Sequence, residues 1–383
     1  MIYLDQAATG FPKPEAVIEE QARCMRTYCG NPGHGSHSLA MAAAAKIYEC
    51  RETAASFFGA SSPNQVIFTL NTTMALNFAI KGLLRAGDHV LISDMEHNAV
   101  YRPIYKMADS GMITYDIFPT FVHQNGRTAQ DICRAIEARI RPNTKMLICA
   151  HASNICSAVL PLRELSALCA RYGLLFVVDA AQSAGHIPID IEEIGIDALC
   201  VPGHKGLCGP QGTGMLILRK GVLADTVLEG GSGVDSLLGV MPSESPERYE
   251  AGTLATPAIA GLCEGIKTVQ SIGIDAIAER EKRMIRYLKK RLSCLRKITL
   301  YVPHHEGALL LFNLWDIPAD ALGNALNRRG ICVRAGYHCS ALGHQTLRTP
   351  VGGAVRVSVG YWNETEELDA LVNALSEISR NGI

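Results

Sequence analysis

The sequence predicts an α/β protein that has a large domain with a mainly parallel sheet and a smaller α+β domain. Between residues 15 and 260, apolar runs typical of strands alternate with amphipathic stretches typical of helices. This alternation favours a parallel sheet that is covered by helices on both faces. A chain of 383 residues also suits two packed domains better than a single core.

The expected strands and helices of the large domain follow one another in regular order. The strand-like runs are residues 65–70, 88–93, 112–118, 145–150, 174–180, 197–201 and 214–219. Helix-like stretches lie between several of them, at residues 72–84, 128–140 and 162–173. In sheets of this kind, ligands bind beyond the carboxyl ends of the strands. We therefore look for a site among the residues that follow these runs.

A long helical stretch leads from the large domain, residues 15–260, to the small one. Residues 257–295 are apolar at first and amphipathic later, which predicts one or two helices. Strand-like runs follow at 308–315, 330–336 and 353–360, and a last helix is expected at 364–378. We assign residues 1–14 and 261–383 to the small α+β domain.

Composition argues against several classes of function. The formal net charge is −1, so the chain lacks the basic character of a general binder of nucleic acids or acidic membranes. We find no apolar run of membrane-spanning length and no signal peptide, and we expect a cytoplasmic protein. The thirteen cysteines contain no C-x-x-C pair, so neither a zinc site nor a disulfide framework is expected.

Two threonines open the helix that is expected at residues 72–84. Thr72 and Thr73 follow a strand-like run, at a place where free backbone N–H groups and the helix dipole attract an anion. Their hydroxyls could add hydrogen bonds to a phosphate. The same residues would also serve as an ordinary helix cap, and this motif alone leaves both interpretations open.

Polar residues follow two further strand-like runs. His97 could stack on a flat aromatic ligand or transfer protons, or it could be an ordinary hydrogen-bonded loop residue. Asp179 ends the apolar run LLFVVD, where a buried carboxylate needs a strong partner such as a protonated ring nitrogen. Gln182 would reach the same ligand. A helix N-cap is the alternative role for Asp179.

Lys205 stands in the segment CVPGHKGLCGPQGTG, after another strand-like run. Lysine is a strongly hydrated charge, so it is either exposed there or placed for covalent chemistry. With the threonines, His97 and Asp179, it completes the set that pyridoxal 5′-phosphate (PLP) requires. That set is an amine for a Schiff base, a carboxylate for the ring nitrogen and a helix N-terminus for the phosphate. We expect the neighbouring glycines to let the backbone approach the cofactor.

With these motifs the chain resembles the cysteine desulfurases of the class V aminotransferase group, which are fold type I PLP enzymes. The resemblance runs nearly end to end, and its most specific pieces are EHNA, VDAAQSAGH, GHKGLCGPQGTG, EAGT and RAGYHCS. It implies a large domain with a mainly parallel seven-stranded sheet. It also implies PLP as the cofactor and L-cysteine as a substrate that is converted to L-alanine.

The resemblance implies a role for each matching residue. Lys205 would form the Schiff base, His97 would stack on the cofactor ring, and Cys339 would accept sulfur as a persulfide. The further implied contacts are Asp179 at the ring nitrogen, Gln182 at the ring oxygen, Thr72, Thr73 and His204 at the phosphate, Thr253 at the phosphate of the partner subunit, and Asn154 and Arg356 at the substrate. Arg356 would grip the α-carboxylate with two hydrogen bonds. The shared site implies a homodimer.

Two features bear on which branch of this family the chain resembles. Pro202 occupies a position where the family usually carries a serine that binds the phosphate, and proline has neither a hydroxyl nor an N–H group. Only sixteen residues separate Cys339 from Arg356, which resembles the branch with a compact cysteine loop. That branch tends to need a protein partner that accepts the sulfur.

The thiolate of Cys339 is the reactive form, so a nearby cation would help, and Arg334 and His338 flank it in sequence. The same residues would suffice for a selenocysteine lyase, which leaves L-selenocysteine open as a substrate. Another class V reaction such as transamination needs no thiol at position 339. A sulfur carrier or scaffold without cofactor chemistry is favoured by Pro202 alone.

No metal site is expected. His34 and His37 lie three residues apart in a glycine-rich loop that lacks other obvious ligands, and a loop near the cofactor suits them better. His304 and His305 are expected in a surface turn.

Overall fold

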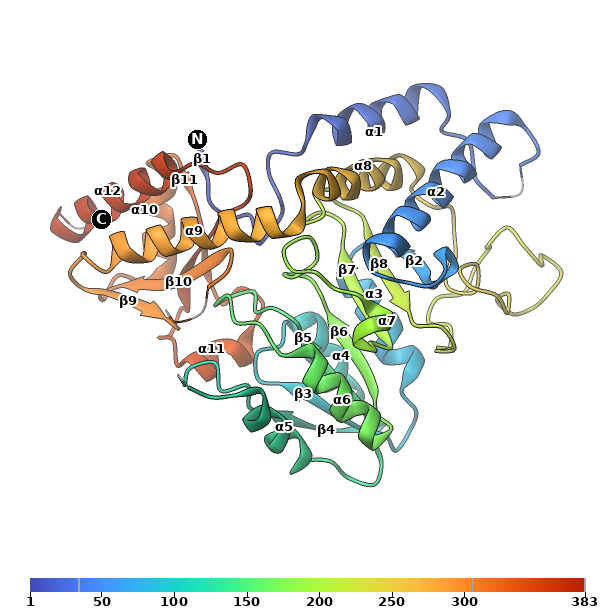
Figure 1. Cartoon of the computed structure of the whole chain (residues 1–383), viewed down its shortest axis with the longest axis horizontal. Coiled ribbons are helices and arrows are strands. Elements are labelled where there is room, and N and C mark those ends of the chain that lie inside the picture. The colour runs from blue at the N-terminus through green and yellow to red at the C-terminus, as the bar shows by residue number, and fades with distance from the viewer. Residues whose placement is uncertain (34, 125, 303, 305, 382–383) are drawn as a thin grey trace.

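The computed structural model describes residues 1–33, 35–124, 126–302, 304 and 306–381. In this part of the chain, a seven-stranded sheet forms the centre of a larger body, and a four-stranded antiparallel sheet forms the centre of a smaller one (Figure 1). The predicted α/β class and the mainly parallel seven-stranded sheet are therefore confirmed. None of the helices in these ranges is long and apolar enough to cross a membrane.

The strands of the large sheet coincide with the runs predicted from the sequence. Their order is β2-β8-β7-β6-β5-β3-β4, and β8 runs antiparallel to both of its neighbours. The strands are β2 (Val66–Thr69), β3 (His89–Ser93), β4 (Thr114–Phe118), β5 (Thr144–Ala150), β6 (Leu175–Asp179), β7 (Ala198–Pro202) and β8 (Gly214–Leu218). Helices cover both faces, which explains why the central strands are almost continuously apolar.

Two apolar cores, one on each face of this sheet, receive most of the helices of the larger body. The helices are α1 (Glu15–Thr27), α2 (Ser38–Phe57), α3 (Thr72–Leu83), α4 (Asn98–Asp109), α5 (Ala129–Glu137), α6 (Leu162–Tyr172) and α7 (Ile191–Ile194), with a 3₁₀ turn, η1, at Pro63–Gln65. Side chains of α3 and α4 fill one core. Those of α2, α5 and α6 fill the other. The three helices predicted between the strands are confirmed.

Gly273 divides the long helical stretch into α8 (Thr256–Ile272) and α9 (Ile274–Leu292). Its φ of 88° lies in the left-handed region that glycine adopts without a steric penalty. Helix α8 packs against α1 and α2 beside the large sheet, whereas α9 extends over the smaller body and contacts its last helix (Figure 1).

The smaller body holds the sheet β12-β13-β10-β9 and a parallel pair of short strands, β1 and β11. Its strands are β1 (Ile2–Tyr3), β9 (Ile298–Tyr301), β10 (Leu309–Leu314), β11 (Ile331–Cys332), β12 (Arg334–Gly336) and β13 (Ala354–Ser358). Its helices are α10 (Ala319–Asn327), α11 (Ala341–Leu347) and α12 (Thr365–Asn381). The N-terminal strand therefore pairs with a strand from the far end of the chain.

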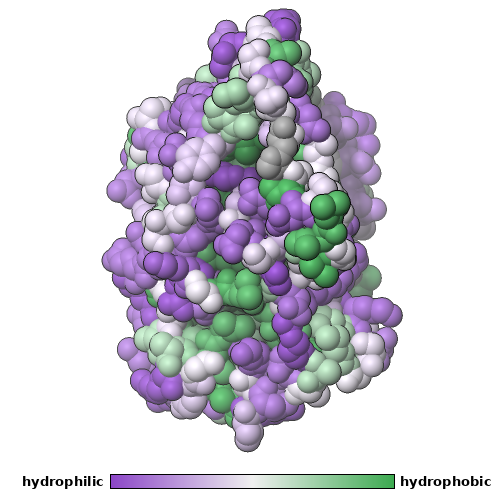
Figure 2. Space-filling model, turned by 90° about the vertical axis from the view of Figure 1, so that its right-hand side faces the viewer, coloured by the Kyte–Doolittle hydropathy of each residue, from purple (hydrophilic) through white to green (hydrophobic). Residues whose placement is uncertain are grey.

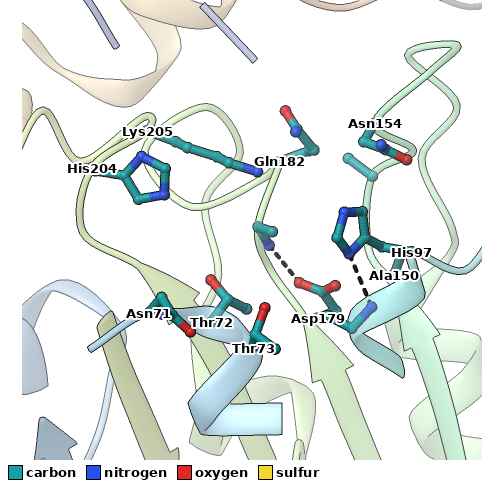
Figure 3. Close-up of a pocket in the computed structure, with 13 residues that line it drawn as sticks. Asn71, Thr72, Thr73, His97, Ala150, Asn154, Asp179, Gln182, His204 and Lys205 are labelled. Atoms are coloured by element: carbon teal, nitrogen blue, oxygen red, sulfur yellow. Dashed lines mark hydrogen bonds between the residues drawn. The ribbon is translucent and has the colours of Figure 1, made fainter. Parts of the chain in front are cut away.

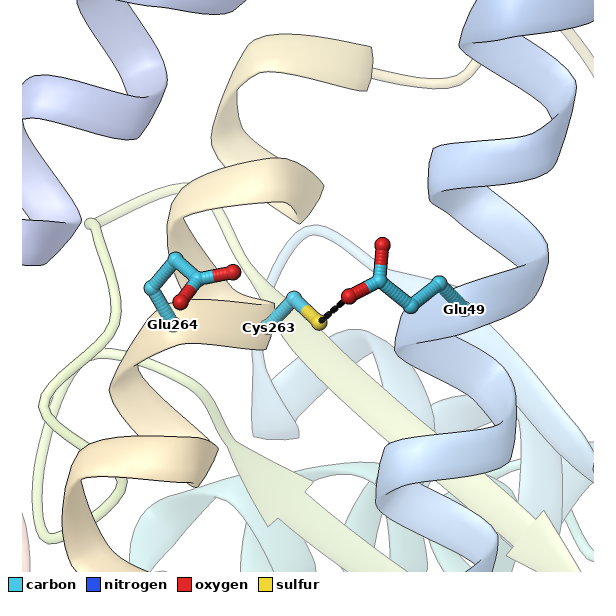
Figure 4. Close-up of side chains that lie close together, drawn as sticks. All are labelled: Glu49, Cys263 and Glu264. Atoms are coloured by element: carbon cyan, nitrogen blue, oxygen red, sulfur yellow. Dashed lines mark hydrogen bonds between the residues drawn. The ribbon is translucent and has the colours of Figure 1, made fainter.

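A charged cluster joins α2 to α8 (Figure 4). Glu49, Cys263 and Glu264 lie close enough together to hold a metal ion. However, the Lys46 ammonium lies 3.2 Å from the Glu49 carboxylate and 2.9 Å from the Glu264 carboxylate. Lys267 contacts both carboxylates as well. Because two ammonium groups compensate the two carboxylates, the cluster acts as an ion-pair network between the helices.

Arg51 on α2 forms an ion pair with Glu250, and the pair is buried because each side chain is only 6% exposed. This ion pair ties the helix to the sheet. The Glu250 carboxylate also accepts the N–H of Phe68 on β2 at 2.6 Å. Breaking a buried pair from one side leaves an uncompensated charge, which is far more costly than breaking an exposed pair.

We expect Arg51→Met to lower the free energy of unfolding by about 3–5 kcal/mol, because the Glu250 carboxylate stays buried without its cation. Arg163→Met is the matched control, since it breaks an exposed pair with Glu193. It should cost less than about 1 kcal/mol. Urea unfolding followed by circular dichroism measures both values, and equal losses would show that burial does not set the cost.

Candidate active site

A cavity of about 200 Å³ lies at the carboxyl ends of the large-sheet strands (Figure 3). Its lining is Asn71, Thr72, Thr73, His97, Ala99, Ala150, Ala152, Asn154, Asp179, Ala181, Gln182, His204 and Lys205. These residues follow different strands, and the parallel topology brings the strand ends to one edge of the sheet. Eight residues predicted from the sequence therefore meet in one cavity: Thr72, Thr73, His97, Asn154, Asp179, Gln182, His204 and Lys205.

The N-terminus of α3 forms one end of the cavity. Asn71 is the N-cap, and its side chain accepts the N–H of Met74 at 2.9 Å. The alternative in which the threonines cap the helix is therefore wrong. The hydroxyl of Thr72 is buried and has no hydrogen-bond partner within the described residues. The sequence did contain a signal for Asn71, because asparagine is among the preferred N-cap residues.

Asp179 is buried at the last position of β6. Its Oδ1 accepts the N–H of Ala181 at 2.8 Å, but residues 181–186 form turns, so the alternative role as a helix N-cap is wrong. Burial raises the pKa of this carboxyl group, and the Ala181 N–H and the Lys205 charge oppose that shift. Burial therefore outweighs the two contacts that favour the ionised form of this carboxyl group.

His97 caps α4 and points its ring toward the cavity (Figure 3). Its Nδ1 accepts the N–H of Ala99 at 3.0 Å. Burial, followed by the charge of Lys205, lowers the pKa of His97 to about 4. The imidazole is therefore neutral near pH 7, and because Nδ1 is an acceptor, Nε2 carries the proton. The ring is hydrogen-bonded, as one interpretation of the sequence holds, and it also faces the cavity, as the other interpretation requires.

Lys205 extends into the cavity and is not an exposed lysine (Figure 3). Burial is the main reason that its pKa falls to about 8; Arg356 and Arg334 lower it further, and Asp179 opposes the shift. A substantial fraction of this amine is thus neutral near physiological pH. The adjacent His204 has a pKa lowered to about 4 by burial and by Lys205. Its Nδ1 lies 3.1 Å from the Thr9 hydroxyl.

The glycines around Lys205 are needed for packing inside the protein. A Cβ on Gly206 would lie 2.3 Å from the carbonyl oxygen of Ala184, and one on Gly203 would lie 2.1 Å from the hydroxyl of Thr213. Both positions therefore exclude a side chain because neighbouring protein atoms occupy the space. The structure thus gives these glycines a different reason from the close approach to a cofactor that we expected.

Arg356 on β13 contacts Asn154 and is 2% exposed. Its guanidinium donates to the carbonyl oxygen of Asn154 at 2.9 Å and to the carboxylate of Asp5 at 2.8 Å. Its Nε is buried without a partner in the described ranges. No local pattern in the sequence points to the role of Asp5, because the two charges are 351 positions apart.

Cys339 is exposed on the turn between β12 and α11. Its carbonyl oxygen accepts the N–H of Asn98, which follows His97, at 2.7 Å. The expectation that His338 supplies a cation here is wrong. Burial and the charge of Arg356 lower the pKa of His338 to about 3, so the ring is neutral. Arg334 is 48% exposed and remains the candidate cation.

Thr253, which was predicted as a site residue, does not line this cavity. It is exposed and lines two other hollows, beside Glu250 and Leu254. Pro202 is buried at the end of β7, where it pairs with Gly214.

The remaining histidines have local roles or fall outside the description. His37 caps α2 by accepting the N–H of Ala40 at 3.3 Å, which explains its conformation without a ligand. His304 is exposed in a turn, as expected. His34 and His305 lie outside the described residues.

The fold and this cavity match a known family. The family model "Aminotransferase class-V" matches residues 2–371. The chain is 34% identical to a probable cysteine desulfurase of Methanothermobacter thermautotrophicus, and the match covers 100% of this chain and 95% of that protein. It is 32% identical to a cysteine desulfurase of Klebsiella pneumoniae, over 99% of this chain and 94% of that protein.

The solved structures agree with the sequence comparison. The apo structure of a cysteine desulfurase from Thermococcus onnurineus NA1 superposes with a TM-score of 0.89 at 27% identity, and the match covers 99% of this chain and 94% of that one. The chain belongs to the class V aminotransferase family. Within this family of enzymes its full-length relatives are cysteine desulfurases, so the resemblance inferred from the motifs is confirmed.

Enzymes of this family depend in general on PLP, and the cavity fits that group. Thr72 presents a buried hydroxyl without a partner in the described chain, at a helix N-terminus suited to a phosphate. Asp179 presents a buried carboxyl group with a raised pKa, and a protonated ring nitrogen would stabilise its ionised form. Lys205 presents an amine whose lowered pKa makes it nucleophilic.

We expect Thr72→Val to leave the stability of the cofactor-free protein unchanged, because the lost hydroxyl has no partner there and the shape is kept. The same change should weaken PLP binding by about 10- to 100-fold, the effect of one hydrogen bond to a charged group. Asn71→Ala is the control and should cost about 1 kcal/mol of stability as a lost cap. Urea unfolding and a PLP titration followed by absorbance test these values. An unchanged PLP affinity would contradict the assignment of Thr72.

Proposed function

We propose that the protein is a PLP-dependent cysteine desulfurase that converts L-cysteine to L-alanine and carries the released sulfur on Cys339. The observation that carries this proposal is the docking of the cysteine turn on the wall of the cavity. The carbonyl oxygen of Cys339 bonds to Asn98, and that of His338 bonds to the side chain of Asn154 at 2.8 Å. The backbone of the turn that carries the exposed Cys339 is thereby anchored to Asn154, which lines the lysine cavity, and to Asn98, which follows His97.

The substrate would be held by Arg356 and Asn154. A carboxylate can accept two parallel hydrogen bonds from one guanidinium, and Arg356 has a buried Nε that lacks a partner within the described residues. Asp5 holds the other side of the guanidinium. The α-carboxylate of L-cysteine would complete this arrangement and leave the thiol end of the substrate free to face Cys339.

Lys205 is suited to move the proton of the substrate Cα, because its amine is partly neutral near pH 7. When bound, PLP supplies the electron sink that makes loss of that proton and cleavage of the C–S bond possible. The thiolate of Cys339 attacks the substrate γ-sulfur and forms an S–S bond. The C–S bond breaks, its electron pair remains on carbon, and a proton completes the methyl group of L-alanine. One sulfur atom moves, so no external oxidant is needed.

The alternatives from the sequence can be compared with this geometry. L-selenocysteine would fit the same residues, so it belongs in the same assay. Transamination offers no use for an exposed cysteine on a turn that is anchored to the cavity wall. A scaffold without cofactor chemistry would not require the partly neutral amine of Lys205 and the raised pKa of Asp179 in one cavity.

A homodimer is part of the proposal. The face in Figure 2 carries apolar side chains among polar ones. Exposed apolar residues gather in one segment of the large body: Leu223, Leu228, Leu237, Leu238 and Val240. Burial of this surface by a second copy would remove apolar area from water. It would also allow the exposed Thr253 to reach the cavity of the partner subunit.

We expect purified, PLP-loaded protein with a reductant to release alanine and sulfide from L-cysteine in equal amounts. Cys339→Ala should lower this release at least 100-fold and abolish a persulfide detected by mass spectrometry. Cys294→Ala is the matched control, because Cys294 is also exposed, and it should retain activity. Activity in Cys339→Ala equal to wild type would refute the role of Cys339. If wild type is inactive with both L-cysteine and L-selenocysteine, the proposed function is wrong.

The lowered pKa of Lys205 gives a pH prediction for cofactor incorporation. The neutral amine is the nucleophile, so the rate of PLP incorporation should rise about tenfold per pH unit below the pKa and level off above about pH 8. Lys205→Ala should abolish the absorbance change. Lys13→Met is the control, because Lys13 lies beside His204 and its pKa is also lowered to about 8. If the pH profile of PLP incorporation changes in Lys13→Met, the titrating group is Lys13 and the assignment to Lys205 is wrong.

A further inference from the structure

The turn that carries Cys339 has a strained backbone. His338 and Cys339 have φ values of 52° and 54°, so two consecutive residues with side chains lie in the left-handed region. Residues other than glycine rarely adopt this conformation. Such strain persists only where the surrounding structure fixes it, and it is common at functional sites.

Three hydrogen bonds fix the backbone of this turn. The carbonyl oxygen of His338 accepts from the side chain of Asn154 at 2.8 Å, and that of Cys339 accepts from the N–H of Asn98 at 2.7 Å. Within the turn, the N–H of Ser340 donates to the carbonyl oxygen of Tyr337 at 2.9 Å. These bonds hold the backbone of the turn, and a separate set of contacts holds the side chain of His338.

His338, His344 and Thr349 form a chain of side-chain hydrogen bonds, which we call the histidine clamp. His338 Nε2 lies 3.2 Å from the carbonyl oxygen of Arg334, and His338 Nδ1 lies 3.1 Å from His344 Nε2. His344 Nδ1 lies 2.8 Å from the Thr349 hydroxyl. The two rings are nearly parallel, at 8°. The clamp thus connects the cysteine turn to the residues beyond α11.

The chemistry of the partners permits one arrangement of protons. A carbonyl oxygen can only accept, so His338 Nε2 must carry the proton. In the neutral ring Nδ1 is then an acceptor, so His344 Nε2 must donate to it. His344 Nδ1 in turn accepts from the Thr349 hydroxyl. Both rings are almost completely buried, and burial lowers the pKa of His338 to about 3 and that of His344 to about 4. The neutral arrangement is thus maintained at physiological pH.

We propose that His338, His344 and Thr349 are positioning residues that hold the Cys339 thiol for attack on the substrate sulfur. This inference rests on the proposed function. The clamp fixes the side chain of His338 while Asn154 fixes its carbonyl oxygen, so the left-handed turn cannot relax. Asn154 also accepts a hydrogen bond from Arg356, which links the turn to the substrate-binding guanidinium. None of the three residues needs to touch the substrate.

His344→Phe tests the clamp, because it keeps an aromatic ring but leaves His338 Nδ1 without a donor. In the PLP-loaded enzyme we expect kcat for alanine formation from L-cysteine to fall at least tenfold. KM and the cofactor absorbance spectrum should stay unchanged, since the cofactor cavity does not include this residue. His344→Gln places an amide N–H near the former Nε2 and should restore most of the loss. Thr349→Val should lower kcat in the same direction but less.

Hydrogen–deuterium exchange of residues 337–341 supplies a readout that does not depend on turnover. We expect faster exchange in His344→Phe than in wild type or His344→Gln. Unchanged exchange or unchanged kcat would overturn the proposal, and so would a loss that affects KM as strongly as kcat. If His344→Phe does not fold, Thr349→Val decides by the same criteria. If the wild type is inactive but hydrogen–deuterium exchange is still faster in the variants, the proposed function is refuted. That result would still support the role of the clamp in holding the turn.

Discussion

Removal of charged groups from water is the constraint on which the site depends. Burial is the first cause of the lowered pKa values of Lys205 and His97 and of the raised pKa of Asp179, so each shift favours the neutral form. For Lys205 the change from 10.5 to about 8 corresponds to roughly 3 kcal/mol in favour of the neutral amine. Burial therefore favours the neutral forms of these groups, and a bound ligand of complementary charge would favour their ionised forms.

The topology of the sheet explains how these groups come together. Asp179 ends β6 and Lys205 follows β7, and parallel pairing places both strand ends at the same edge. The sheet therefore sets the positions of the residues that line the cavity. Arg356 belongs to the smaller body, and its guanidinium donates a hydrogen bond to the carbonyl oxygen of Asn154 at this edge. The carboxylate of Asp5, near the N-terminus, accepts a second hydrogen bond and orients the guanidinium. Closing the site thus requires both bodies of the chain.

Sequence patterns predicted the strands and the residues that follow them, because these depend on local composition. They missed the features that depend on contacts between distant parts of the chain. The strands were predictable because strands covered on both faces are almost continuously apolar, and the site residues because they follow strand ends. His338 was misjudged, because its closeness to Cys339 in sequence says nothing about its burial. Asp5 could not be found, because no local rule pairs it with Arg356. The role of Gly206 depended on the position of Ala184, which lies on a different turn.

The anchoring of the cysteine turn also bears on how sulfur leaves the site. Four residues, 337–340, connect β12 to α11. Because extended chain spans at most about 3.6 Å per residue, so short a connection gives the thiol little reach even if it were free. The carbonyl oxygens of His338 and Cys339 are bonded to the large body, which removes most of that reach. If Cys339 carries sulfur as we propose, its persulfide would stay beside the cavity, and an acceptor would have to come to it. The exposure of Cys339 satisfies that requirement.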